Sequence, residues 1–527
     1  MWEAPADGTG SIRSVLSLDR DALTPIRVPH FMTTGVSKAP ENSERGRRLP
    51  PIPVKTEMIV LGGIGLVFAL VCVWLVSRGA PLGHDEAVYA LKARTLAEGT
   101  TSAFFWNDYR APGLPMALAL IGRFVSSDAS MRLGVVVFGG LAILLTWLIG
   151  RKLFDQRVGL GAATGMAFSP VVIASASSVW PDLPGTAIGL AVLTVLIFSV
   201  QKDTVSWWVL AAAPLSVAAT LVRFGAPIPV GMGAVAIAVW RWKVVRRSVP
   251  QVVALGVLTG VPVWVLLSTS LIGGALSPLD AIASLDSSND FPFYQGLVDY
   301  AKMADFLVLN PPGLLLVVGV IFGIVTAVRV PSSRKSFALP AVIALVTVLG
   351  LALTLHGEYR YLAPAYPWLW ISAAFGLSEA SRSLGTAFVG PGIAALLVLT
   401  ILGGAADGGV EVAKNKERFP DIRTAAIQLN QATNDGECGV ITGYVPQVAW
   451  YSRCVTTNFS TEDVRLTSRS FPDDPVLYLF VVQDGKRQAD GATLDGYLDL
   501  VDGDCLEVGE PDDGPFRYVR ACPVSEP

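Results

Sequence analysis

The stretch that decides the fold runs from residue 57 to residue 94. It opens with EMIVLGGIGLVFALVCVWLVS (57–77), in which only the first residue is charged. It continues as RGAPLGHDEAVYALKAR (78–94), where ionisable side chains follow one another closely. A helix needs about 20 apolar residues to cross the roughly 30 Å hydrocarbon core of a bilayer. The first half therefore predicts a membrane-spanning helix, and the second half predicts a polar helix that begins at the membrane surface.

The same apolar pattern recurs along the chain. Of its 527 residues 52% are hydrophobic and 16% are charged, and the mean hydropathy is +0.52. A soluble protein needs more charge to cover its surface, so the bilayer is the expected solvent for much of this one. The further apolar windows lie at 131–150, 158–178, 184–200, 206–223, 226–241, 249–271, 305–328, 337–355, 361–378 and 385–404. The sequence thus predicts an α-helical polytopic membrane protein with about 11 transmembrane helices over 56–404.

The connections between these windows alternate in character. One set is short and basic, with Arg151, Lys152, Arg241, Lys243, Arg246, Arg247, Arg329, Arg334 and Arg382 among its members. By the positive-inside rule these connections face the cytoplasm, together with a Pro-, Ser- and Arg-rich tail at 1–55 that we expect to be disordered. The other set faces outward and contains the long loops 78–130 and 272–304. An odd number of spans in the plasma membrane then leaves the C-terminus exoplasmic.

Residues 405–527 differ in composition from the rest. They carry a net charge of −10, whereas the remaining residues carry +7. This difference suggests that the two parts lie in different compartments, and neither part has the clustered basic residues of a nucleic-acid-binding protein. A helix at about 420–433, a strand opening at Cys438, another opening at Cys454 and a third at 476–482 predict a small α/β domain. Cys505 and Cys522 lie across an expected hairpin turned at 511–514. Two disulfides, Cys438–Cys454 and Cys505–Cys522, fit this pattern and require an oxidising, exoplasmic compartment, while four reduced structural thiols are the alternative.

The first outer loop carries the most informative polar cluster. His84, Asp85 and Glu86 are consecutive ionisable residues a few positions beyond the first span. On a helix, Asp85, Tyr89 and Lys92 share one face. We expect this helix to lie along the membrane surface with its acidic start at the outer mouth of the bundle. An ordinary helix start, at which the macrodipole favours an acid, is the alternative.

Further charges flank prolines at the outer ends of later spans. Tyr109 and Arg110 precede Pro112 and Pro115, which hold the arginine on a rigid backbone where it can bind a phosphate or an interfacial headgroup. Asp182 lies in a short turn between two spans, where it is either functional or a helix cap. Arg223 ends the fifth span and needs an anion as its partner.

The last outer turn reads HGEYRYLAPAYP (356–367). If the outer loops converge, carboxylates face guanidiniums in one pocket, a combination suited to a reaction in which a hydroxyl loses a proton while a phosphate departs. The predicted participants are His84, Asp85, Glu86, Tyr89, Tyr109, Arg110, Asp182, Arg223, His356, Glu358, Tyr359 and Arg360. Each histidine could instead make only a hydrogen bond at the interface.

This order of motifs resembles the GT-C glycosyltransferases of the protein O-mannosyltransferase and lipid A aminoarabinose transferase type. The shared features are Asp85-Glu86 after the first span, Arg110 before two prolines, Asp182-Leu-Pro184, and RYLAPAYP (360–367). The resemblance covers about 57–404. Ala111 stands where the family has a proline after the basic residue, and no match to the acid-Lys-Pro stretch of the aminoarabinose enzymes is evident, so the sugar is left open.

The resemblance implies inverting transfer of a sugar from a polyprenyl-phosphate donor to an exoplasmic acceptor. Asp85, with Glu86 and Asp182 beside it, would act in catalysis, and Arg110, Arg223 and Arg360 would hold the departing lipid phosphate. Some members of the family bind a divalent metal ion; if one binds here, Asp85 and Asp182 are its expected ligands. A transporter or flippase for a lipid-linked substrate is the competing hypothesis, supported by the Asn310-Pro-Pro-Gly313 break. A non-catalytic envelope scaffold is a third.

Overall fold

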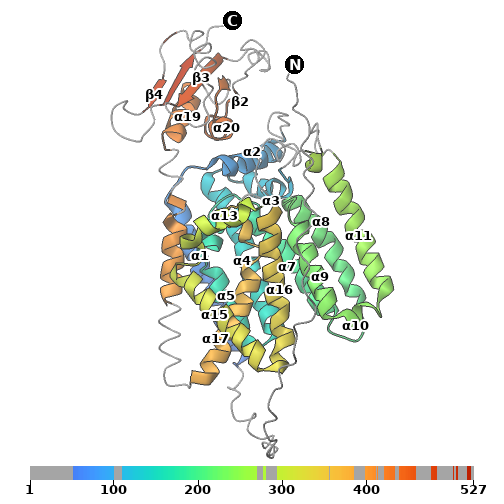
Figure 1. Cartoon of the computed structure of the whole chain (residues 1–527). Coiled ribbons are helices and arrows are strands. Elements are labelled where there is room, and N and C mark those ends of the chain that lie inside the picture. The colour runs from blue at the N-terminus through green and yellow to red at the C-terminus, as the bar shows by residue number, and fades with distance from the viewer. Residues whose placement is uncertain are drawn as a thin grey trace, which may run out of the picture. The chain divides into compact units, whose positions relative to one another are not determined.

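The structure is a computed structural model. It describes residues 52–99, 110–269, 277–280, 294–354, 357–384, 398–410, 412–413, 420–433, 438–458, 476–482, 503, 506–508 and 519–523. The described part is mostly helical, with one small sheet in its C-terminal portion (Figure 1). Residues 1–51 of the tail expected at 1–55 and much of the loop expected at 272–304 fall outside these residues, and α1 begins at Val54, inside the expected tail. The helix Val398–Val410 runs past the domain boundary expected at 404.

Six helices in the described residues are long and apolar enough to cross a membrane: α1 (Val54–Ser77), α4 (Asp128–Leu153), α7 (Asp182–Ser199), α11 (Val249–Ser268), α15 (Pro311–Arg329) and α16 (Pro331–Thr354). A seventh crossing is made if α5 (Gln156–Ala167) and α6 (Pro170–Ala176), bent by 60°, count as one. Shorter helices occupy the other windows: η3 (Trp207–Ala211) with α8 (Ala212–Val222), α9 (Pro227–Trp240), α17 (Tyr366–Leu384) and Val398–Val410. The polytopic helical fold is confirmed, and each of the eleven windows contains a helix.

The helix boundaries follow from local side-chain chemistry. Ser127 caps α4, because its hydroxyl accepts a hydrogen bond from the Ser130 amide at 3.2 Å. Asp155 caps α5 in the same way and also pairs with Arg382 of α17 at 2.7 Å. The bend between α5 and α6 falls at Pro170, whose ring cannot continue the preceding helix. Polar residues at the ends of the apolar windows therefore decide where these helices stop.

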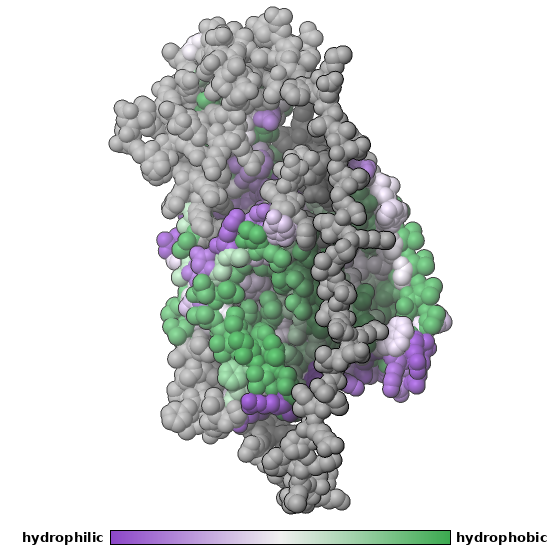
Figure 2. Space-filling view, viewed as in Figure 1, coloured by the Kyte–Doolittle hydropathy of each residue, from purple (hydrophilic) through white to green (hydrophobic). Residues whose placement is uncertain are grey.

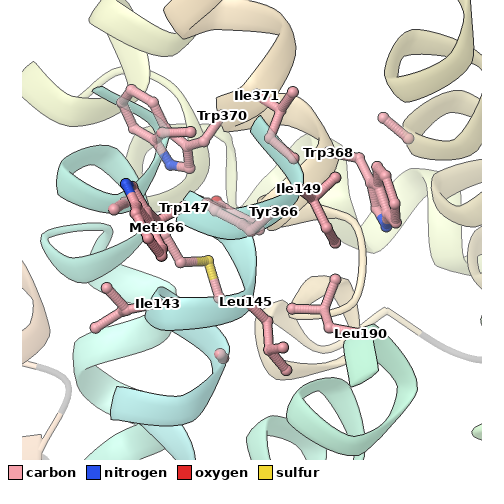
Figure 3. Packing of buried hydrophobic residues seen from close by; sticks show 14 of the residues in the cluster. Ile143, Leu145, Trp147, Ile149, Met166, Leu190, Tyr366, Trp368, Trp370 and Ile371 are labelled. Atoms are coloured by element: carbon pink, nitrogen blue, oxygen red, sulfur yellow. The ribbon is translucent and has the colours of Figure 1, made fainter. Parts of the chain in front are cut away.

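The bundle core is packed around large aromatic side chains. Trp368 and Trp370 of α17 are almost fully buried and lie among Met166, Trp147 and aliphatic residues of α4 and α5 (Figure 3). Small residues let the helices approach: a Cβ atom at Gly376 of α17 would lie 1.9 Å from the carbonyl oxygen of Gly319 on α15. Close backbone contact of this kind is how helices associate inside a bilayer.

The outward surface of the bundle is apolar. Every side chain of α11 is at least partly exposed, including Trp264, which is 64% exposed, and α1 presents Ile59 and Leu70 outward. Figure 2 shows this as a band of hydrophobic surface with hydrophilic residues above and below it. Such a band matches the hydrocarbon zone of a membrane protein.

The two ends of the bundle differ. At one end lie α2 (His84–Glu98), α3 (Gly113–Gly122), α13 (Gln295–Lys302), α14 (Ala304–Leu307) and η4 (Tyr359–Leu362), with α2 lying across the helix ends (Figure 1). We call this the α2 end. The opposite end carries α10 (Trp242–Val245) and the neighbouring basic residues Arg241, Arg246 and Arg247.

The C-terminal domain is the small α/β domain expected from the sequence. Its five-stranded sheet has the order β2-β1-β3-β5-β4. The central strand β3 (Val476–Val482) is parallel to β1 (Cys438–Ile441) and antiparallel to β5 (Val519–Pro523), and β2 (Val455–Thr457) and β4 (Leu506–Val508) form the edges. Two helices, α19 (Pro420–Ala432) and α20 (Val445–Ser452), pack against it through buried residues such as Leu429 and Val448.

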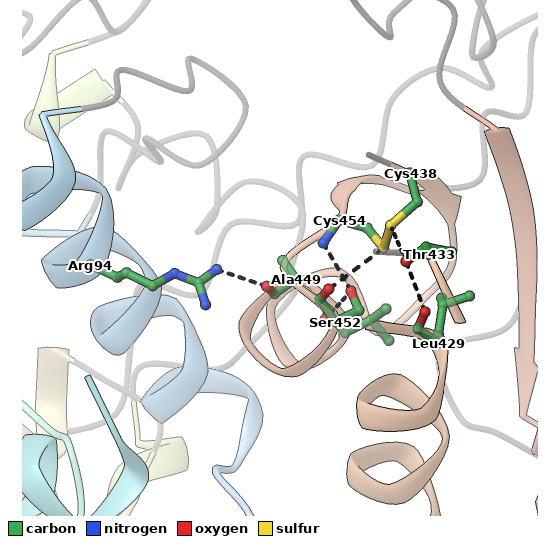
Figure 4. The surroundings of a disulfide bond; sticks show 8 residues. Arg94, Leu429, Thr433, Cys438, Ala449, Ser452 and Cys454 are labelled. Carbon is green, nitrogen blue, oxygen red and sulfur yellow. Dashed lines mark hydrogen bonds between the residues drawn. A yellow bond between two sulfur atoms is a disulfide. The ribbon is translucent and has the colours of Figure 1, made fainter. Parts of the chain in front are cut away.

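The cysteine prediction is confirmed where it can be followed. A disulfide joins Cys438 at the start of β1 to Cys454 just after α20, which braces the end of that helix against the sheet (Figure 4). Cys522 is also disulfide-bonded, and its predicted partner Cys505 lies outside the described residues. Cys72, inside α1, is free and buried.

Candidate active site

The start of α2 places an acid at the α2 end of the bundle. Gly83 caps the helix and its amide donates to the Glu86 carboxylate at 2.9 Å, which forms one half of a capping box and fixes the first turn. Asp85 is the second residue of that turn. Its two carboxylate oxygens accept separate hydrogen bonds, from Arg110 at 2.8 Å and from Arg360 at 2.7 Å. The Asp85 side chain is 32% exposed, so solvent reaches it.

A second acid comes from a different span. Asp182 is the first residue of α7, is almost fully buried, and forms an ion pair with Arg223, which follows α8. The Nε atom of Arg360 lies 4.0 Å from Asp182 and 2.5 Å from Glu358. One guanidinium therefore sits among three carboxylates. We call this set the mouth cluster: Asp85, Arg110, Asp182, Arg223, Glu358 and Arg360.

Aromatic rings hold these guanidiniums in place. The Arg360 guanidinium lies 4.8 Å from the ring centre of Trp180, and Tyr361 lies between Arg360 and Arg223, at 5.4 Å and 5.0 Å. Trp180 also packs edge-on against Tyr359. Cation–π contacts fix the planes of the guanidiniums without consuming their N–H donors. The arginines are thus oriented, yet they keep donors for an incoming anion.

The surroundings of Asp85 and of Arg360 shift the pKa of each toward the charged form. Burial alone would raise the pKa of Asp85, but Arg110 and Arg360 together bring that pKa below its usual range. Burial would lower the pKa of Arg360, yet Asp182, Glu358 and Asp85 raise it well above the ordinary value. Burial raises the pKa values of Tyr89 and Tyr361, so both phenols stay protonated.

A narrow apolar groove adjoins the cluster. Asp182 and Arg223 stand at its polar end, and it continues between α7, α9 and α17 along small and aliphatic residues. On α7 these include Gly185, Gly189 and Leu193, which recur every fourth residue on one face. Its volume is about 20 Å³, room for about one water molecule, so the helices that line it are closely packed in this structure.

The structure brings most of the predicted residues together. Asp85, Arg110, Asp182, Arg223, Glu358 and Arg360 form the mouth cluster, and His84 precedes Asp85 and interacts with it electrostatically. Tyr89 faces Arg110 at 5.9 Å, and Tyr359 stands behind Trp180. Tyr109 and His356 lie outside the described residues.

Glu86 is placed elsewhere. Its side chain is fully buried behind α2, where its oxygens accept hydrogen bonds from Arg132 and from the amides of Gly83 and Val179. Sequence reasoning passed over Arg132, although a lone arginine in the first turn of an apolar span was a usable signal. It also gave no role to Tyr361, which stands inside the quoted turn 356–367, or to Trp180, which lies two residues before Asp182.

The donor set of the described residues does not fit a metal ion. Both oxygens of Asp85 accept from guanidiniums, and Asp182 is paired with Arg223. No group of three His, Cys, Asp or Glu side chains suited to a metal occurs among the described residues. A cation placed between Asp85 and Asp182 would also meet the Arg360 guanidinium. No catalytic step is therefore assigned to a metal here.

Comparison with known proteins supports the fold. Residues 110–266 match the family model for dolichyl-phosphate-mannose-protein mannosyltransferase. No curated protein sequence matches the chain. ArnT from Cupriavidus metallidurans in the apo state superposes with a TM-score of 0.63 at 14% identity, covering 89% of this chain and 98% of ArnT; the form bound to undecaprenyl phosphate gives 0.61 at the same identity and coverage.

A second structural relative is archaeal. The oligosaccharyltransferase AglB from Archaeoglobus fulgidus, in complex with an inhibitory peptide and a dolichol-phosphate, superposes with a TM-score of 0.51 at 13% identity, covering 80% of this chain and 69% of AglB. At such low identity these likenesses concern the fold. The chain therefore shares the fold of these two proteins.

Proposed function

We propose that this protein is a membrane glycosyltransferase that transfers a sugar from a polyprenyl-phosphate donor to an acceptor hydroxyl, with inversion at the anomeric carbon. One observation carries the proposal: carboxylates and guanidiniums alternate across the mouth cluster at the α2 end of the apolar bundle. The guanidiniums match a phosphate, and the apolar outer surface of the bundle matches the prenyl chain that the phosphate carries. The ArnT and AglB structures contain undecaprenyl phosphate and dolichol-phosphate.

In the proposed reaction the acceptor oxygen attacks the anomeric carbon of the donor. The bond from that carbon to the phosphate oxygen breaks, its electrons stay on the departing polyprenyl phosphate, and the acceptor proton passes to Asp85. Arg110, Arg223 and Arg360 stabilise the negative charge that grows on the phosphate. Removing one such preorganised donor typically costs about 10²–10³ in rate. His84, Tyr89, Tyr359, Glu358 and Asp182 are the proposed lining of the sugar and phosphate sites.

The hydrogen bonds of Asp85 suggest how the base is controlled. With no donor bound, Arg110 and Arg360 occupy both carboxylate oxygens and lower its pKa, which makes it a weak base. A donor phosphate offers the same guanidiniums a competing anion. As they turn toward the phosphate, the pKa of Asp85 rises toward its ordinary value. Donor binding and activation of the base are therefore linked through shared arginines.

The proposed orientation puts the α2 end on the exoplasmic side of the plasma membrane and the N-terminal tail in the cytoplasm. The disulfide Cys438–Cys454 belongs to the domain that contacts α2, and disulfides persist in oxidising compartments. The basic residues Arg241, Arg246 and Arg247 lie at the opposite end, as the positive-inside rule requires for the cytoplasmic face. The acceptor is then an exoplasmic lipid, glycan or protein.

The test uses the full-length protein in proteoliposomes with a panel of polyprenyl-phosphate sugars. Wild type is expected to consume one donor and release polyprenyl phosphate. Asp85→Asn is expected to lower that rate by about 10²–10⁴, the usual contribution of a general base, while Asp203→Asn, an exposed acid in the Gln201–Thr204 turn, leaves it unchanged. Donor translocation without cleavage would instead favour the flippase, and full activity of Asp85→Asn would remove the assigned base.

A further inference from the structure

A second cavity lies beside α2, between the helical bundle and the C-terminal domain. We call it the junction cavity. Its volume is about 420 Å³, enough for a headgroup or a small sugar phosphate. It is lined by the outer end of α1, by Arg94 of α2, by the residues around the start of α4, by Arg423 of α19, and by Trp450, Tyr451 and Arg453 of α20 and its end.

Direct contacts fix the relation of α20 to this cavity. Arg94 donates two hydrogen bonds of 2.8 Å to the carbonyl oxygens of Ala449 and Trp450, the first of which appears in Figure 4. These carbonyls belong to the last turn of α20, where no intrahelical donor exists, so Arg94 caps the helix. Asp128 at the start of α4 accepts from Trp450 at 2.7 Å and from Tyr451 at 2.9 Å. The walls of the cavity are therefore held by hydrogen bonds on both sides.

The charge in the junction cavity is unbalanced. Four arginines and one acid line it: Arg94, Arg132, Arg423, Arg453 and Asp128. Arg132 is neutralised from behind by Glu86. Three guanidiniums then face the single carboxylate of Asp128, and no ion pair of the three is found within the described residues. Burial, with a further contribution from Arg453, lowers the pKa of Arg94 to about 10 against the opposing effect of Glu98. Repulsion of this kind disappears when an anion enters.

The donors that stay available belong mainly to the C-terminal domain. Arg423 uses one nitrogen on the carbonyl of Gly79, and its guanidinium lies 5.7 Å from the Tyr451 ring. Arg453 is exposed and is the only non-glycine residue with positive φ, at 61°, in the described part of the chain. Arg453 is the left-handed C-cap of α20, which turns the chain at the rim of the cavity. The adjacent Cys454 is held by its disulfide, which fixes Arg453 at the rim.

The position of the cavity indicates where its ligand comes from. Val76 and Ser77, at the end of α1, form part of the lining, and one turn further down α1 Val73 and Trp74 are exposed on the apolar surface. A headgroup in the cavity would leave its acyl chains beside that surface. The hydroxyl of Ser126 also lines the cavity, whereas those of Ser77 and Ser127 donate to the carbonyl of Trp74 and to the hydroxyl of Ser130.

We propose that the junction cavity binds a phosphate group, held by Arg423 and Arg453 with Arg94 behind them, and carried by a lipid headgroup or as free phosphate. The inference does not rest on the proposed transfer reaction, because no residue that lines the cavity belongs to the mouth cluster. Along the helix axis Arg94 is about 14 Å from Asp85, at 1.5 Å per residue. Arg132, which lines the cavity, is bonded to Glu86 on the side of α2 away from the mouth cluster.

The test measures binding by titration calorimetry on the full-length protein in detergent, with inorganic phosphate and with water-soluble dihexanoyl phosphatidic acid as probes. The double variant Arg423→Gln/Arg453→Gln is expected to bind the cavity probe at least about tenfold more weakly, since two charge-assisted contacts are lost. Arg246→Gln/Arg247→Gln, at the opposite end of the bundle, serves as the matched control. Arg360→Gln, which alters the mouth cluster, is expected to keep the cavity site.

A variant that is expected to bind the probe more tightly shows that a weaker affinity in the double variant is not caused by misfolding. Asp128→Asn removes the one carboxylate of the lining and is expected to tighten binding about threefold, because a screened like charge is lost. A lipid probe that binds tenfold better than phosphate would identify a headgroup, and equal affinities would identify the free anion. The proposal is overturned if neither probe binds, or if the double glutamine variant binds both as tightly as wild type does.

Discussion

Asp85 and Glu86 are adjacent in the chain and have opposite surroundings. Asp85 is partly exposed, and each of its oxygens accepts one hydrogen bond from an arginine that also has other contacts. Glu86 is fully buried, and its oxygens accept two hydrogen bonds from Arg132 and two from backbone amides. A helix turns by about 100° per residue, so neighbouring side chains point to different faces of α2. One acid therefore reaches the mouth, and the other lies behind the helix.

The difference teaches which contacts can be exchanged. The guanidinium of Arg132 also donates to the carbonyls of Ala80 and Pro81, so each of its three nitrogens donates at least one hydrogen bond within the protein. The Glu86–Arg132 pair thereby joins α4, the link before α2, and the residue Val179 that precedes Asp182 by three positions. At Asp85 an incoming anion can replace the carboxylate as the partner of Arg110 or Arg360. At Glu86 the hydrogen bonds are buried and cannot be exchanged with a ligand. We therefore expect the Glu86–Arg132 pair to stabilise the fold and the pairs of Asp85 to act in the proposed reaction.

The largest effect is expected from breaking the buried pair. Arg132→Ala leaves Glu86 ionised, buried and short of two donors, a change that costs about 3–5 kcal/mol in comparable pairs. We expect a clear fall in the unfolding temperature of the detergent-solubilised protein, followed by intrinsic tryptophan fluorescence. Asp85→Asn, one residue from Glu86, should leave that temperature nearly unchanged.

A double variant sharpens this result. Glu86→Gln with Arg132→Met removes both charges together, so it should be less destabilised than Arg132→Ala alone, because no uncompensated charge is left inside. If Arg132→Ala unfolds at the wild-type temperature, the distinction drawn between the two acids is wrong.

The next effect tests the ion pairs of Asp85. Arg360→Gln removes the guanidinium that bridges Asp85, Asp182 and Glu358. The rate of donor consumption should fall by about 10²–10³. The unfolding temperature should fall as well, because Arg360 is buried among three acids, but by less than in Arg132→Ala. Arg382→Gln is the matched control, because Arg382 also bridges two acids, Asp155 and Glu379, at the far end of the bundle. A loss of equal size in both variants would mean that ion pairs affect the rate only through the fold.

How much of this arrangement the sequence predicts depends on distance along the chain. The spans, the acids at their ends and the disulfide Cys438–Cys454 are local or compositional features, and they were predicted. The separation of Asp85 from Glu86 depends on which helix covers the rear of α2, a tertiary contact made by Arg132 from 46 positions away. The junction cavity depends on Arg94 meeting α20, which is more than 350 positions later. Local sequence patterns do not predict tertiary contacts between residues so far apart in the chain.

A smaller effect concerns pH. In the free enzyme Arg110 and Arg360 keep the pKa of Asp85 low despite its burial, so Asp85 stays ionised at every pH above the usual aspartate range. The acid limb of kcat/KM due to this group should lie below that range, and the acid limb of kcat should lie higher, because the donor phosphate draws the arginines away. Arg360→Gln should move the kcat/KM limb upward. Coincident limbs in wild type would contradict the sharing of arginines between Asp85 and the donor.

The smallest effect reaches the mouth from the C-terminal domain. Tyr451 accepts a hydrogen bond from the Leu82 amide at 2.8 Å and donates one to Asp128, so the domain touches the chain three residues before Asp85. Tyr451→Phe removes both bonds and should cost about 1–3 kcal/mol of docking energy, seen as faster hydrogen exchange in α2 and α20. Because Glu86 and Arg132 fix the same link independently, the rate of sugar transfer should change by less than about threefold. A larger loss would mean that docking of the C-terminal domain, rather than the buried ion pair, sets the position of Asp85.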